Sequence, residues 1–178
     1  MRWAALLVAA ALAGPALADP AVPEPDGYRM DDYRAPVPQT LHGATVLHIE
    51  AMRDLVARHE AVLIDVLPAP RRPEGMRAGT PWIPQPHRSL PGSLWWPDVG
   101  RGAISDSLES HFRHRLEEAV GHPPRLAVFF CLSECWMSWN AAKRAAAFGF
   151  RVAWFPEGAD GWEAAGLPLR AVQPEWLH

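Results

Sequence analysis

The only two cysteines of the chain, Cys131 and Cys135, lie four residues apart. An apolar run at residues 126–130 leads directly into Cys131, and a helix-forming run at residues 139–148 follows Cys135. Open parallel sheets bind ligands beyond the carboxyl ends of their strands, so a thiol at such a junction is well placed for reaction. The free N–H groups and the positive dipole end of the following helix would favour a thiolate there. The alternative is a buried, purely structural thiol pair, which is common for cysteine.

Thiol chemistry fits this spacing. Backbone N–H groups of the loop could form a cradle that binds an anion beside Cys131. Cys135 could attack a persulfide or sulfenate on Cys131 and close a disulfide, or that disulfide could exchange with a partner thiol. We expect Cys131 to attack and Cys135 to resolve, because Cys131 directly follows the strand and should lie nearer the N–H groups. The expected cradle comprises Leu132, Ser133, Glu134, Trp136, Met137 and Ser138.

Two other residues are expected to support this site. Asp65 stands inside the apolar run at residues 61–67, and we expect it to pin the edge of the sheet rather than to catalyse. Trp139 flanks the second cysteine. Trp136 falls in a predicted loop, where an exposed indole ring would indicate recognition of a partner.

A metal centre is the weaker alternative for these cysteines. Two cysteines and two of the eight histidines could together bind zinc or copper(I), but no histidine lies close to the pair in sequence. We expect His87, His111, His114 and His122 to be surface or core residues. The motif is also not a covalent haem site, because Trp136 stands where the haem-ligating histidine would be. The sequence therefore predicts neither a metal nor a cofactor.

Residues 1–18 have the pattern of a secretory signal peptide. Arg2 is a short basic start, residues 3–13 are apolar, and Ala16-Leu17-Ala18 is a small-residue cleavage site. The apolar run is shorter than the roughly 20 residues that span a bilayer, and no later run is long enough. We expect cleavage after Ala18 and a soluble periplasmic protein. Export places the cysteines in an oxidising compartment, which favours a disulfide between them. Such a short bridge stabilises little through chain entropy, which argues for chemistry rather than stapling.

The charge balance excludes one class of partner. The net charge of the full chain is −3, and Arg71-Arg72 is the only basic cluster. Nucleic acid is therefore not an expected partner.

The remaining chain is expected to form one domain. Residues 19–44 are rich in proline and charge and predict an extended lead-in with Tyr28 and Tyr33 as anchors. Alternating strands and helices over residues 45–178 predict an α/β fold, with a central, mostly parallel sheet and helices on both faces. Hydrophobic patterns predict strands at 45–47, 61–67, 93–96, 126–130 and 152–155, and helices at 50–59, 108–120, 139–148 and 158–165. A long proline-rich loop, residues 68–97, includes the third of these strands.

The ordered landmarks of this domain resemble those of rhodanese domains. They are Leu63-Ile64-Asp65-Val66, Leu90-Pro91-Gly92-Ser93, the strand ending at Cys131, the helix with Ala141-Ala142 closed by Gly149-Phe150, Trp162 and Ala165-Gly166-Leu167-Pro168. The resemblance implies a rhodanese-like fold in which Cys131 holds the position of the sulfur-accepting cysteine.

The string from Cys131 to Ala142 is similar to a narrower, exported family, the PQQ-dependent catabolism-associated CXXCW motif proteins. Gly27-Tyr28-Arg29 and the run at residues 33–38 are similar to that family as well. The resemblance implies an accessory role in pyrroloquinoline quinone-dependent alcohol oxidation, with a quinoprotein dehydrogenase or c-type cytochrome as partner and a small sulfur or thiol substrate. Three residues, not two, separate the cysteines here.

The loop after Cys131 departs from an ordinary rhodanese because it carries no basic residue and one acidic residue, Glu134. One like-charge contact with an anionic donor costs about 4 kcal/mol at 4 Å and an effective dielectric constant near 20. We therefore expect weak thiosulfate sulfurtransfer. Two hypotheses follow: a thiol enzyme that transfers sulfur or exchanges disulfides, and a rhodanese-fold binding module without turnover of its own.

Overall fold

The protein is built on a five-stranded, wholly parallel sheet. The computed structural model describes residues 21–83 and 85–177. The strand order is β1-β6-β5-β2-β4, and each neighbouring pair is parallel. The strands are β1 (Thr45–Val46), β2 (Ala61–Asp65), β4 (Leu94–Trp95), β5 (Leu126–Phe130) and β6 (Val152–Trp154). The predicted α/β class is confirmed.

The two central strands, β2 and β5, have the sequence character of strands that are covered on both faces. Both are continuous apolar runs, and they pair in register from Ala61 opposite Leu126 to Asp65 opposite Phe130. Four of the five residues in each strand are buried. Because strands of a parallel sheet are covered by helices on both sides, alternation of polar and apolar residues is absent.

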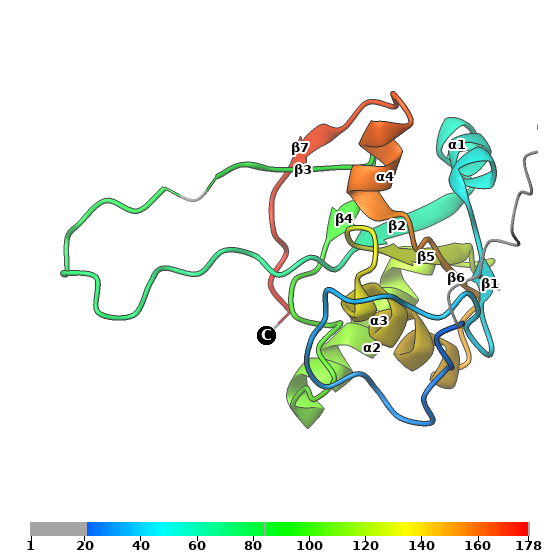
Figure 1. Ribbon diagram of the computed structural model, residues 1–178, viewed down its shortest axis with the longest axis horizontal. Helices are drawn as coiled ribbons and strands as arrows, with labels where there is room; N and C mark the ends of the chain where they lie inside the picture. Colours follow the sequence, from blue (N-terminus) through cyan, green and yellow to red (C-terminus); the bar gives the residue numbers. More distant parts are fainter. Residues whose placement is uncertain (1–20, 84, 178) are drawn as a thin grey trace, which may run out of the picture.

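Helices cover both faces of the sheet, as Figure 1 shows. The helices α2 (Asp106–Val120) and α3 (Trp136–Ala147) lie on one face, and α1 (Ile49–Arg58) and α4 (Gly158–Ala164) lie on the other. Neighbouring residues of β5 face opposite ways. Phe129 belongs to the core under α2 and α3, and Phe130 to the core under α1 and α4.

A small antiparallel sheet was not predicted from the sequence. It pairs β3 (His87–Ser89) with β7 (Arg170–Val172), in register from His87 opposite Val172 to Ser89 opposite Arg170. The segment between β2 and β3 extends away from the body in Figure 1 and is called the arm here, residues 68–86. The predicted loop at 68–97 is thus an arm followed by two short strands.

Helix α3 begins three residues earlier than predicted, at Trp136 rather than residue 139. It ends at Ala147, one residue before the predicted end, and the predicted capping glycine, Gly149, has a φ of 88°. The N–H groups of Gly149 and Phe150 donate to the carbonyls of Ala146 and Ala145, which closes the helix in a Schellman motif.

The predicted lead-in is an extended segment that lies across α3, shown in blue in Figure 1. Residues 21–44 are called the strap here. Tyr28 and Tyr33 anchor it: the Arg144 guanidinium lies 4.1 Å from the Tyr28 ring, and the Tyr33 hydroxyl accepts a hydrogen bond from Gly102 N–H at 3.0 Å.

The predicted signal peptide, residues 1–18, lies outside the described residues. Within residues 21–83 and 85–177, none of the helices has the length and apolar character needed to cross a membrane.

Candidate redox site

Cys131 and Cys135 form a disulfide at the carboxyl edge of the sheet. Cys131 directly follows β5, and Cys135 is the N-cap residue of α3. Their Cα atoms lie 6.1 Å apart, within the range of disulfides. Both residues are almost fully buried, with 1% and 2% of their surface exposed. The sulfurs therefore lie where the sequence placed them, but they are oxidised to a bridge and covered.

The loop between the cysteines is fixed by the segment that starts α4. The N–H and hydroxyl groups of Ser133 donate to the two carboxylate oxygens of Asp160, at 2.6 and 3.0 Å. Ala159 N–H donates to the Cys131 carbonyl at 2.8 Å. A Cβ on Gly158 would lie 2.5 Å from the Leu132 carbonyl carbon, so only glycine permits this approach. Glu134, at φ 50°, turns the chain back towards the helix.

The expected anion cradle is partly closed by hydrogen bonds within the protein. Ser133 N–H is taken by Asp160, Trp136 N–H donates to the Tyr33 carbonyl at 2.9 Å, and Ser138 N–H donates to the Cys135 carbonyl at 3.2 Å. Leu132 forms an isolated bridge with Gly158, and the Glu134 carbonyl accepts from Ala35 N–H. Met137 packs tightly on Gly100. Protein acceptors thus use donors that an anion would need.

Trp136 is also not the exposed recognition residue that was expected. It is the first residue of α3, only 3% exposed, and its indole N–H donates to the Pro36 carbonyl at 3.1 Å. Trp139 is fully buried, and its indole N–H donates to the Thr40 carbonyl at 3.2 Å. Both rings hold the strap rather than a partner.

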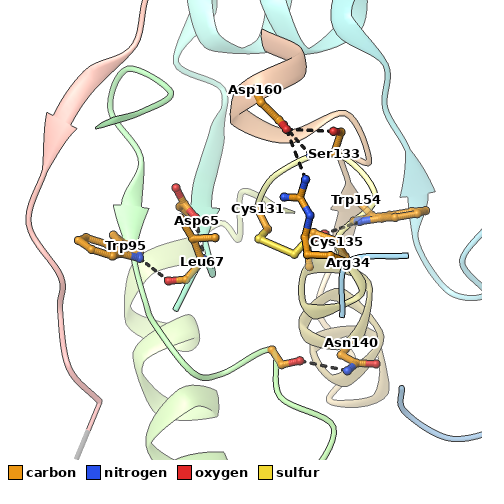
Figure 2. The surroundings of a disulfide bond; sticks show 12 residues. Arg34, Asp65, Leu67, Trp95, Cys131, Ser133, Cys135, Asn140, Trp154 and Asp160 are labelled. Atoms are coloured by element: carbon orange, nitrogen blue, oxygen red, sulfur yellow. Dashed lines mark hydrogen bonds and ion pairs between the residues drawn. A yellow bond between two sulfur atoms is a disulfide. The ribbon is translucent and has the colours of Figure 1, made fainter. Parts of the chain in front are cut away.

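The strap supplies a cation that the loop itself lacks. Arg34 pairs with Cys135 in an antiparallel backbone bridge, and its guanidinium lies 3.9 Å from the Asp160 carboxylate. Figure 2 shows Arg34 and Ser133 both directed at Asp160, beside the disulfide. Inspection of the loop sequence alone missed Arg34 and Asp160, since they lie about 97 residues before and 29 residues after Cys131 in the numbering. The tyrosine-anchored lead-in around Tyr33 was the available signal.

Asp65 has the structural role that was predicted for it. The residue is fully buried. Its carboxylate accepts hydrogen bonds from Leu67 N–H at 2.9 Å and from the Ser89 hydroxyl at 2.6 Å, and it pairs with His87 Nε2 at 2.6 Å. Asp65 therefore connects the end of β2 to β3, and both of its carboxylate oxygens accept hydrogen bonds.

No group of three or more His, Cys, Asp or Glu side chains in the described part of the chain is arranged to hold a metal ion.

A separate cleft of about 830 Å³ opens between the base of the arm and the C-terminal tail. It combines indole rings with cations: Trp82, Trp176, Arg71, Arg72 and Arg101 line it, with Asp98 at its floor. Burial would raise the pKa of Asp98, but hydrogen bonds from Arg71 and Arg101 outweigh burial and lower it.

No protein-family profile matches the chain, and no curated protein matches it. Three solved structures are similar. A thiosulfate sulfurtransferase from Pseudomonas aeruginosa matches 76% of this chain at 23% identity and a TM-score of 0.47, over only 22% of its own length. The human single-domain sulfurtransferase TSTD1 matches 68% of this chain and 96% of its own, at 24% identity and a TM-score of 0.42. An uncharacterized protein from Saccharomyces cerevisiae matches 69% of this chain and 93% of its own, at 18% identity and a TM-score of 0.40.

The likeness concerns fold alone. Identities and TM-scores this low carry no argument about activity. The narrower CXXCW resemblance stays a prediction.

Proposed function

We propose that this rhodanese-like domain exchanges disulfides with dithiol substrates through Cys131 and Cys135. The observation that carries the proposal is a disulfide closed across the junction of β5 and α3. In the chain-entropy treatment, a loop this short contributes about 2 kcal/mol, near the lower end of what disulfides supply. A short bridge at the carboxyl edge of a parallel sheet, beside a helix N-terminus, is better placed for reaction than for stapling.

The exchange runs in two balanced steps. A substrate thiolate attacks the sulfur of Cys131, a mixed disulfide forms, and Cys135 leaves as a thiolate at the N-cap of α3. The dipole of α3, whose positive end lies at Cys135, favours that charge. The second substrate thiolate then attacks the substrate sulfur of the mixed disulfide and releases Cys131. Two electrons and two protons pass to the protein, and the substrate leaves as a disulfide.

The surroundings favour a thiol over an anionic sulfur donor. Asp160 and Glu134 place two carboxylates at the loop, against a single guanidinium from Arg34. The N–H groups of Ser133 and Trp136 are already bonded. Thiosulfate would therefore meet fewer free donors and negative charge, so we expect its sulfurtransfer to cyanide to be weak.

The cellular setting is a proposal from the sequence resemblance. We place the protein in the periplasm, after removal of residues 1–18, as an accessory to pyrroloquinoline quinone-dependent alcohol oxidation. The dithiol would belong to a quinoprotein dehydrogenase or a c-type cytochrome of that system. Intact mass of protein taken from the periplasm tests this setting: a chain starting at Asp19 supports it, and one starting at Met1 in the membrane fraction contradicts it.

The exchange itself is tested with the purified, oxidised protein and a reduced dithiothreitol probe in equal amounts. Samples quenched with an alkylating agent should show two alkylated cysteines on the protein, and oxidised probe in a one-to-one ratio with it. Cys135→Ser has no disulfide for a thiol to attack, so it is treated with oxidised glutathione instead. The mixed disulfide on Cys131 should persist, because no second protein thiol can displace the glutathione. No reduction of the folded protein by the dithiol would reject the function.

A second candidate is a binding module, and the cleft beside the arm favours it. Two indole rings and three guanidinium groups face an opening of about 830 Å³, an arrangement that suits an acidic protein surface. In this reading the buried disulfide only stiffens the domain. Unimpaired partner binding by Cys131→Ala/Cys135→Ala, with loss of binding by Arg72→Glu, would favour this candidate over the first.

A further inference from the structure

One face of α3 carries a row of side-chain donors that hold the backbone of the strap. Trp136, Trp139, Asn140 and Lys143 are spaced as neighbours on a single helix face, and they are called the donor stripe here. Their N–H groups donate to the carbonyls of Pro36, Thr40, Arg29 and Pro25, at 3.1, 3.2, 2.8 and 2.7 Å. The helix thus binds the strap as an extended peptide.

The donor stripe is specific for an extended backbone. Asn140 makes a paired contact with one residue: its Nδ2 donates to the Arg29 carbonyl, and its Oδ1 accepts from Arg29 N–H at 2.9 Å. The indole rings of Trp136 and Trp139 are 3% and 0% exposed beneath the strap. Without the strap, these donors would lose their acceptors and the rings would be uncovered, which is unfavourable.

The strap also bonds to the disulfide loop, on both sides of Cys135. Ala35 N–H donates to the carbonyl of Glu134 at 3.2 Å, and the Tyr33 carbonyl accepts from Trp136 N–H at 2.9 Å. The residues before and after Cys135 are therefore the attachment points. Any shift of Cys135 moves both of them.

We expect reduction to cause such a shift, because Cys131 and Cys135 are 1% and 2% exposed and their packed side chains have little room to rotate apart. Two thiols cannot stay at bonding distance, so the sulfurs must separate to non-bonded contact when the bond breaks. Glu134 occupies a left-handed conformation, at φ 50°, which costs free energy for a residue with a side chain. The disulfide on one side and the strap bridge on the other hold it there. Once the disulfide is gone, relaxation of Glu134 opposes the bridge.

We propose that the strap is a redox-coupled cover, docked over the disulfide when Cys131 and Cys135 are bonded and released when a dithiol reduces them. The coupling is reciprocal: reduction weakens strap binding, and strap binding slows reduction. This inference concerns regulation of the exchange site and so rests on the proposed function. The reductant is the dithiol itself, which gives up two electrons and two protons and becomes a disulfide.

Hydrogen exchange tests the first half of the coupling without requiring any turnover. Peptides covering residues 25–40 should exchange faster in the protein reduced with a phosphine than in the oxidised protein. The same increase should occur in Cys131→Ala/Cys135→Ala, which has no disulfide to reduce. Helix α2 packs on the same core, and none of the described strap residues hydrogen-bonds to it, so its exchange should change little. Equal strap protection in all three proteins would overturn the proposal, as would a uniform increase that includes α2.

The second half is tested with two substitutions at one position. Ala35→Pro removes the N–H that bonds Glu134, whereas Ala35→Ser retains it. The disulfide of Ala35→Pro should be reduced by dithiothreitol about tenfold faster than that of wild type, as expected for loss of one hydrogen bond from the cover. Ala35→Ser should match wild type. Equal rates for Ala35→Pro and wild type would reject the cover. A protein that accepts electrons from no dithiol, yet releases its strap in the double alanine variant, would reject the proposed function and leave the coupling intact.

Discussion

At the scale of single residues, the position of Cys135 changes the electrostatic expectation for the pair. The sequence argument gave the better stabilised thiolate to Cys131, because that residue follows the strand. The structure makes Cys135 the N-cap of α3. An N-cap residue lies at the positive end of the helix dipole, so we expect the stabilisation at Cys135, which suits it as the leaving group.

After reduction, Cys135 should therefore carry the larger thiolate fraction at neutral pH. The measurement is the ultraviolet absorbance of the thiolate across pH in Cys131→Ala and in Cys135→Ala, each with one free thiol. The curve for Cys135 should lie at lower pH than the curve for Cys131. The reverse order would return the leaving-group role to Cys131.

At the scale of elements, the start of α4 is what shapes the disulfide loop. Gly158 has a φ of 60° and packs against Leu132 and the Cys131 carbonyl. Gly121, after α2, has a similar φ of 68°, but a Cβ there would meet no atom within 4 Å. Substitution of Gly121 therefore tests backbone strain alone, whereas substitution of Gly158 tests backbone strain and steric contact together.

Gly158→Ala should cost about 2–4 kcal/mol of unfolding free energy, whereas Gly121→Ala should cost only about 1–2 kcal/mol. Urea unfolding measures both values. Gly158→Ala should also speed reduction of the disulfide by dithiothreitol, because the loop must shift away from α4, and Gly121→Ala should not. Matching costs for the two variants would show that the loop tolerates the added methyl group.

The arm is attached to the body through a charged contact. Arg71 from the arm and Arg101 from the body both bond the carboxylate of Asp98, which is 8% exposed. Against the effect of burial, these hydrogen bonds lower the pKa of Asp98 below its ordinary value of 3.8. A group with a lowered folded-state pKa stabilises the protein fully above its unfolded pKa, and this contribution is lost as pH falls through the folded pKa.

Asp98→Asn should consequently lower the unfolding free energy by about 1–2 kcal/mol at pH 7. The difference from wild type should shrink as the pH falls below about 3.8. Urea titrations of both proteins from pH 7 to acid would measure it. A constant difference at all pH values would mean that packing, not charge, is what the substitution removes.

At the scale of the whole molecule, one hydrophobic core lies on each face of the sheet. Both cores consist mainly of side chains other than the two cysteines. The core under α1 and α4 contains no cysteine, and the core under α2 and α3 is dominated by aromatic and aliphatic residues. Reduction should therefore leave a folded protein.

We expect reduction to lower the unfolding free energy by roughly 2 kcal/mol and the Tm by roughly 4–8 °C. Differential scanning calorimetry with and without a phosphine reductant measures the shift. Loss of the cooperative transition on reduction would make the disulfide a structural staple and would weigh against the exchange function.

Much of this architecture can be predicted from the sequence. The run at residues 126–130 predicts β5 with its observed bounds, because a strand buried on both faces is a continuous apolar segment with sharp ends. The start of α3 was missed because Trp136 to Ser138 follow a cysteine loop and have no apolar period of their own. β3 and β7 were missed because each has only three residues and they pair across 83 positions, which no local pattern encodes.

The site was predicted less completely than the fold, because its contacts also join residues that lie far apart in the sequence. The positions of Cys131 and Cys135 follow from local order. The closed state of their loop does not, because it depends on Asp160 and on strap residues near Tyr33 that reach the loop only after folding. Hydrogen bonds between an irregular segment and a distant helix leave no periodic signal in the sequence.

The order of synthesis gives the strap one more consequence. Pro25 and Arg29 leave the ribosome early, but their partners Lys143 and Asn140 follow 118 and 111 residues later. At translation rates of about 5–20 residues per second, that delay is on the order of ten seconds. During this interval the strap has no helix to bind, and Cys131 and Cys135 emerge before α3 is complete. In the oxidising compartment that we propose, the bridge can form before the strap docks, and docking of this early segment onto the later helix α3 is the step that covers it.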